Sequence, residues 1–73
     1  MILNGGIPTS ADGEKIAKML NADEIGRNSY GSLTLRFNTV NVDEIESKMS
    51  TISQHVTEWD LSDYNTAIIW NYQ

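Results

Sequence analysis

The sequence predicts a small α/β protein, a two-layer sandwich in which two helices cover one face of a three-stranded sheet. Two observations lead to this fold class. Residues 32–38 alternate apolar and polar side chains with a period of two, as in a strand with one buried face. Residues 42–59 repeat apolar side chains at spacings of three and four, as in an amphipathic helix. The expected order is strand, helix, strand, helix, strand over a single small domain, residues 1–73, with a small α+β fold as the alternative.

The first part of the chain is expected to hold a short strand and a helix. Residues 1–3 form the strand, and the glycines at positions 5 and 6 end it. The helix starts at Thr9 or Ser10, because either hydroxyl can accept a hydrogen bond from the first turn. It ends between residues 21 and 23, and Gly26 lies in the loop that follows.

The second helix has the clearest start. Asn41 is the expected N-cap, and Glu44 stands three residues later in a capping-box arrangement. The apolar stripe runs through six positions: Val42, Ile45, Met49, Ile52, Val56 and Trp59. A helix of about 18 residues spans roughly 27 Å, enough to return the chain to a parallel neighbour of the strand at 32–38.

The last segment, residues 64–72, is rich in β-branched and aromatic side chains and is predicted to be a strand. Its alternation places Ala67 and Ile69 on one side and three aromatic residues on the other: Tyr64, Trp70 and Tyr72. Two alternatives follow. Either Trp70 fills the core together with Ile68, or the three aromatic residues form an exposed strip.

Composition excludes several function classes. The 73 residues include ten Asp or Glu, five Lys or Arg and no Cys, with a formal net charge of −5. An acidic chain is unsuited to direct nucleic-acid binding, and the absence of Cys removes disulfides, thiolate catalysis and Cys-based zinc sites. No apolar run approaches the roughly 20 residues of a membrane span, and the start lacks the basic region of a signal peptide. We therefore expect a cytoplasmic protein that needs no membrane, cofactor or metal.

One group of side chains has the residue types of a metal site. His55 lies close in sequence to three carboxylates, Glu58, Asp60 and Asp63. These residues straddle the end of the predicted helix without a recognisable ligand spacing, which favours an acidic surface. No nucleophile elbow accompanies the single histidine, so the sequence predicts that the protein is not an enzyme.

The predicted function is therefore non-enzymatic protein binding. The size and acidity are typical of small inhibitors from phage and mobile elements, which occlude a larger host enzyme or complex. An aromatic anchor ringed by carboxylates would suit a protein partner with a basic surface. The predicted contact residues are Tyr64, Trp70, Tyr72, Glu58, Asp60 and Asp63. Three alternatives stay open: a homo-oligomeric accessory subunit such as a homodimer, an acidic nucleic-acid mimic, and a small metal-dependent enzyme, which has the least support.

Overall fold

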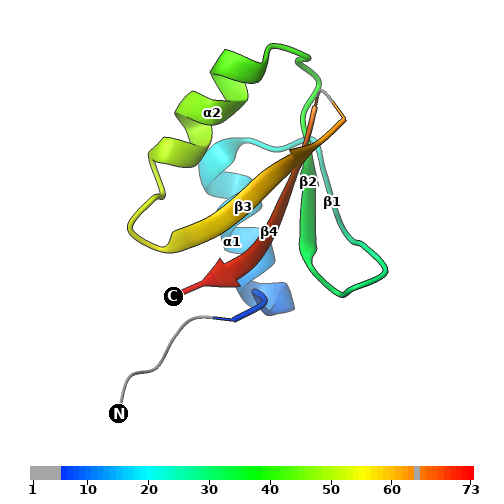
Figure 1. Ribbon diagram of the computed structural model, residues 1–73, viewed down its shortest axis with the longest axis vertical. Coiled ribbons are helices and arrows are strands. Elements are labelled where there is room, and N and C mark those ends of the chain that lie inside the picture. The colour runs from blue at the N-terminus through cyan, green and yellow to red at the C-terminus, as the bar shows by residue number, and fades with distance from the viewer. Residues whose placement is uncertain (1–5, 64) are drawn as a thin grey trace.

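The computed structural model describes residues 6–63 and 65–73, which form a small α+β fold of two helices and a four-stranded antiparallel sheet (Figure 1). The elements along the chain are α1 (Ser10–Leu20), β1 (Glu24–Arg27), β2 (Leu33–Arg36), α2 (Val42–Ser50), β3 (Val56–Ser62) and β4 (Thr66–Tyr72). The strand order in the sheet is β1-β2-β4-β3. The last strand of the sequence therefore lies inside the sheet, between β2 and β3.

One hydrophobic core joins both helices to the sheet. Across the β2–β4 ladder, Leu33 pairs with Ile69 and Leu35 pairs with Ala67, and all four side chains are buried. These residues share one face of the sheet because side chains alternate along a strand. The helices add the buried side chains of Ile16, Leu20, Ile45 and Met49 to the same cluster. Among the described residues, no helix covers the opposite face.

Both helix starts are confirmed. The Thr9 side chain accepts a hydrogen bond from the Asp12 amide at 3.2 Å, and the Asn41 side chain accepts one from the Glu44 amide at 3.2 Å. The first helix ends at Asn21, whose φ of 57° is a left-handed conformation that stops the helix. Neither helix of the described residues is long and apolar enough to cross a membrane.

The prediction of a three-stranded sheet is wrong. Residues 24–27, which we expected to lie in a loop because of Gly26, form β1 and pair antiparallel with β2. All four residues of β1 are exposed, so the strand has no alternation of buried and exposed positions to reveal it. The strand expected at residues 1–3 lies outside the described residues.

The prediction of a helix continuing to Trp59 is also wrong. The second helix ends at Ser50, and Val56–Ser62 form β3. Ser and Thr residues around position 50 are weak helix formers, and the Thr51 hydroxyl donates to the Lys48 carbonyl at 2.6 Å. The β-branched and aromatic residues that follow favour a strand. Ile52 and Val56 are buried as the apolar stripe implied, although a turn and a strand place them there.

The expected parallel pairing is corrected as well. The last strand, β4, is antiparallel to β2 on one side and to β3 on the other. The strands β2 and β3 therefore run in the same direction, and α2 connects them across the intervening β4, as a crossover connection requires.

Candidate interaction surfaces

The face of the sheet opposite the helices carries an exposed tryptophan. Along β4, Ala67 and Ile69 are buried, while Ile68 is partly exposed and Trp70 is 38% exposed. On the neighbouring strand Asp60 pairs with Ile68 and is exposed. Of the two alternatives for this segment, the structure therefore has Ala67 and Ile69 in the core and Trp70 at the surface.

An irregularity in the β3–β4 ladder sets Trp70 apart. Trp59 pairs with Ile69, but the next pair is Glu58 with Asn71, so Trp70 has no opposite residue on β3. A residue left over in this way forms a β-bulge, which bends the strand and interrupts the regular alternation of side chains. Trp70 therefore lies on the open face of β4, and 38% of the residue is exposed.

Tyr72 does not lie on the same side of β4 as Trp70, as predicted for an aromatic strip, because of this bulge. Strict alternation would put Tyr72 on the same side as Trp70, but Tyr72 packs against the core cluster, and its ring centroid lies 6.0 Å from that of His55. Its backbone amide donates to the Gly6 carbonyl at 2.8 Å and its carbonyl accepts from the Gly6 amide at 3.1 Å. The third residue of the strip, Tyr64, lies outside the described residues.

Two of the three predicted carboxylates lie beside Trp70. One oxygen of Glu58 accepts a hydrogen bond of 3.4 Å from the side chain of Asn71, the residue after Trp70. Asp60 accepts one of 2.8 Å from the Leu61 amide. Asp63 is exposed in the turn between β3 and β4, at the other end of the strand, with a φ of 60°. Glu58 and Asp60 thus pair with Asn71 and Ile68, one residue after and two residues before Trp70, whereas Asp63 lies apart.

The grouping of His55 with carboxylates does not form a ligand cluster. No set of three His, Cys, Asp or Glu side chains in residues 6–63 and 65–73 is arranged to hold a metal ion. The His55 ring is instead 3.1 Å from the backbone carbonyl of Gln73 through Nδ1.

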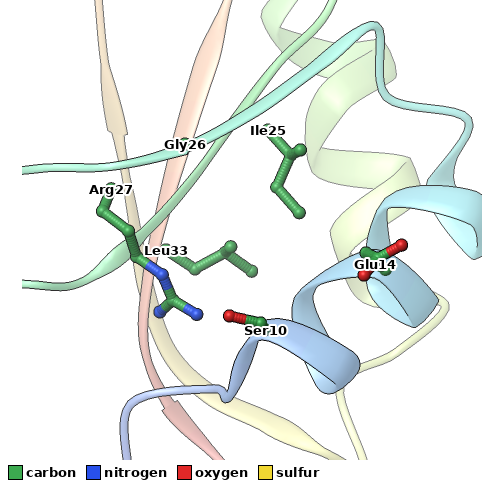
Figure 2. Close-up of a pocket in the computed structure, with 6 residues that line it drawn as sticks. All are labelled: Ser10, Glu14, Ile25, Gly26, Arg27 and Leu33. Atoms are coloured by element: carbon green, nitrogen blue, oxygen red, sulfur yellow. The ribbon is translucent and has the colours of Figure 1, made fainter.

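A second surface, missed from the sequence, is a groove between α1 and β1 (Figure 2). Its volume is about 340 Å³, and six residues line it: Ser10, Glu14, Ile25, Gly26, Arg27 and Leu33. Ile25 is 46% exposed there. Figure 2 shows the Arg27 guanidinium extending toward the Ser10 hydroxyl, with Glu14 one turn further along the helix. The only signal in the sequence was Ile25, an isolated apolar residue among polar ones. A single apolar residue does not establish the period of two that identifies a strand.

Exposed apolar side chains also occur at the hairpin between β1 and β2. Tyr30 is 85% exposed at its tip. The Asn28 side chain holds this turn by accepting hydrogen bonds from the amides of Tyr30 at 3.0 Å and Ser32 at 2.9 Å. Asn28 and Gly31 were the turn residues that could have indicated a hairpin here.

A single ion pair occurs among the described residues, between Arg36 on β2 and Glu24 on β1. The hydrogen bond and the charge of Arg36 lower the pKa of Glu24, and Glu24 in turn raises the pKa of Arg36. The pair therefore favours the folded state at pH values above the ordinary pKa of glutamate. This contribution disappears as the pH falls through the lowered pKa of Glu24. It is small because both side chains are exposed.

Replacing Arg36 by Gln is expected to raise the pKa of Glu24 to the ordinary value for glutamate. The reason is that the neutral side chain removes the charge that favours the ionised carboxylate. A pH titration of the Glu24 side-chain resonances by NMR measures the change. Lys15→Gln removes an exposed positive charge on α1 and should leave the pKa of Glu24 unaltered. Equal pKa values in the parent and Arg36→Gln would contradict this ion pair.

Comparison of the chain with protein-family models, with curated proteins and with solved structures gave no match.

Proposed function

We propose that the protein is a non-enzymatic interaction module that binds a protein partner with a basic surface. The contact is the Trp70 surface, defined here by Trp70, Ile68, Glu58 and Asp60. The observation that carries this proposal is the exposure of Trp70 at a bulge, on the sheet face that no described helix covers.

The residue types of the Trp70 surface suit protein recognition. Tryptophan is enriched among residues that dominate binding energies, because it combines a large apolar area with one hydrogen-bond donor. Ile68 is partly exposed beside it and extends the apolar area along β4. Both side chains can therefore be buried when a partner protein covers this face of the sheet.

The flanking carboxylates determine the kind of partner. Glu58 and Asp60 are exposed on the edge strand next to the apolar area. The chain as a whole carries a net charge of −5, so its long-range field attracts a basic surface and accelerates association with it. Lys or Arg side chains around an apolar depression would complement the Trp70 surface.

A small protein that binds in this way can act by occlusion. We therefore propose an inhibitor that acts in the cytoplasm and covers a functional surface of a larger enzyme or complex. The mechanism requires no chemistry from the small protein, because inhibition follows from the area that it hides. Association should be fast at low salt and slower when salt screens the charges.

The test uses the immobilised protein and a lysate of the source organism, with three baits. A protein retained by the parent should also be retained by Tyr30→Ala, which removes an exposed aromatic side chain elsewhere. The same protein should be lost with Trp70→Ala. The purified captured protein is then titrated with each variant. Trp70→Ala should weaken binding at least about tenfold, or about 1.4 kcal/mol, as for a central interface residue.

A charge variant completes this test. Asp60→Lys should slow association and reduce its dependence on salt, while the dissociation rate changes less. Either of two results would contradict the proposal. One is a captured protein that binds Trp70→Ala as tightly as the parent, and the other is an affinity that does not change with salt.

A further inference from the structure

The two edges of the sheet differ in how well they are protected from another strand. On β3, Asp60 already accepts the hydrogen bond of the outward-pointing Leu61 amide, and Glu58 adds a second charge. The register shifts at Trp70 and between Val56 and Glu58 distort the same ladder. Charged side chains and bulges are the devices by which proteins prevent edge-to-edge pairing. The edge at β1 has no bulge, and the charge of Glu24 is paired with that of Arg36 on β2.

The hydrogen-bonding direction along β1 follows from the ladder. The Asn28 amide donates to the Ser32 carbonyl at 3.1 Å, in the same register as the β1–β2 pairs. Hydrogen-bonded and non-hydrogen-bonded pairs alternate in antiparallel strands. The backbone groups of Gly26 therefore point toward β2, and those of Ile25 and Arg27 point away from the sheet.

The neighbouring ladder confirms this direction. The Phe37 amide donates to the Asn65 carbonyl at 2.8 Å, in the register of β2 with β4. Leu33 and Leu35 therefore direct their backbone groups toward β4, which leaves those of Thr34 and Arg36 for β1. The outer edge of β1 thus presents two amides and two carbonyls, from Ile25 and Arg27.

We propose that a second copy of this chain pairs along β1, antiparallel, about a two-fold axis through Gly26. In this register Ile25 of each copy lies opposite Arg27 of the other copy. All four outward groups of each copy then form hydrogen bonds. Gly26 meets its own copy at a non-hydrogen-bonded pair, where the Cα atoms approach to about 4.5 Å and the absence of a side chain removes any clash.

Other registers fit less well. An axis through Ile25 would set Arg27 opposite Asp23 of the second copy, but the Asp23 amide already donates to the Arg36 carbonyl at 2.8 Å. An axis between two residues would set a residue of the helix-facing side opposite a residue of the open side. Because residues directly opposite each other share a face, the helices of the two copies would then lie on opposite faces of the sheet. The axis through Gly26 keeps both helical layers on one side of an eight-stranded sheet.

Charge complementarity in the groove supports this occupant. Ile25 and Arg27 are on the helix-facing side of β1, because they pair with the buried Leu35 and Leu33. Arg27 of the second copy therefore arrives beside Ile25, in the groove that Glu14 lines. Neither Glu14 nor Arg27 belongs to an ion pair in the described part of the chain, although the Arg27 guanidinium donates to the Gly31 carbonyl at 3.2 Å. The two-fold axis creates the Glu14–Arg27 pairing twice.

A charge exchange tests the proposal. The masses of the parent, Arg27→Glu, Glu14→Arg and the double variant are measured by sedimentation at low salt. Concentrations run from about 10 µM to about 1 mM, suited to a small interface. The parent should form a dimer. Each single variant should raise the dissociation constant at least about tenfold, and the double variant should restore it to within about threefold, because the opposite charges meet again.

Two matched variants control for net charge. Lys15→Glu makes the same change of charge as Arg27→Glu, and Glu46→Arg the same as Glu14→Arg, and both positions are exposed and do not line the groove. Both should dimerise like the parent. A parent protein that stays monomeric at every concentration overturns the proposal. A dimer whose dissociation constant is the same in the parent, the single variants and the double variant also overturns it.

Amide hydrogen exchange provides a readout at the edge itself. The amides of Ile25 and Arg27 should exchange more slowly as the concentration rises, since dimerisation buries them. The Gly26 amide should be protected at every concentration, because its hydrogen bond is to β2 within one copy. Equal exchange of Ile25 and Arg27 at low and high concentration would overturn the assignment of the edge even where a dimer forms. The Trp70 surface belongs to the opposite side of the sheet, so this dimer and the proposed binding are tested separately.

Discussion

Replacing Phe37 by Ala is expected to lower the free energy of unfolding by about 3–5 kcal/mol, the usual cost of removing a buried aromatic ring. Phe37 is 1% exposed and belongs to the core cluster. A chain of this size has about 4–11 kcal/mol in total, so the variant should be close to unfolded without denaturant. Urea denaturation followed by circular dichroism measures the loss.

The backbone of Phe37 explains why its side chain is so well placed. Its amide donates to the Asn65 carbonyl at 2.8 Å, and its carbonyl accepts from the Asn65 side chain at 3.1 Å. The Lys48 ammonium lies 5.9 Å from the centre of its ring, on the side of α2. These contacts fix the ring between the end of β2 and the second helix.

Val40→Ala is the matched control for this prediction. Val40 is an apolar residue three positions along the chain, but it is 68% exposed. Its replacement should change the unfolding free energy by no more than about 0.5 kcal/mol, as for surface substitutions in general. A loss at Val40 comparable to that at Phe37 would mean that the core has been placed incorrectly.

Replacing Gly13 by Val should cost about 2 kcal/mol of stability. A Cβ atom at this position would lie 2.9 Å from Leu33 Cδ1 and 3.2 Å from Ile25 Cδ1. The two methyl groups of valine extend the crowding against a buried leucine, and overpacking of this kind costs about 1–3 kcal/mol. The better helix propensity of valine recovers only a few tenths of a kcal/mol. Thermal and urea unfolding measure the difference.

Ala11→Val separates packing from helix propensity. Ala11 is in the same turn of α1 as Gly13 but is exposed. The substitution introduces the same side chain and should cost only about 0.6 kcal/mol, the propensity difference between Ala and Val. A Gly13→Val protein as stable as Ala11→Val would show that α1 does not approach the sheet so closely.

Local features of the fold were predictable from the sequence. The side chains of Thr9 and Asn41 begin the two helices by accepting hydrogen bonds from residues three positions later. The neighbouring residues in the sequence are therefore enough to locate these helix starts. The alternation of Leu33 and Leu35 also identified the buried face of β2 correctly. These signals act within a few residues and do not depend on the rest of the chain.

The features that could not be predicted depend on contacts between segments that are distant in the sequence. Ile52, Val56 and Trp59 have helical spacing, yet the pairing of Val56 and Trp59 with β4 makes them part of a strand. The packing of Tyr72 against the core breaks the alternation of β4, and it goes with a bulge that only the opposite strand defines. The groove beside Ile25 requires α1 and β1 to pack together, and no pattern within β1 alone reports that contact.

The position of β4 has a consequence for synthesis of the protein. This strand follows β2 and β3 in the chain, yet it lies between them in the sheet and is the strand that joins them. While a ribosome is still adding residues 66–72, β3 has no strand to join and the apolar side of β2 is covered only in part. The sheet therefore cannot close before residues 66–72 emerge, and until then the nascent chain exposes apolar surface that chaperones bind.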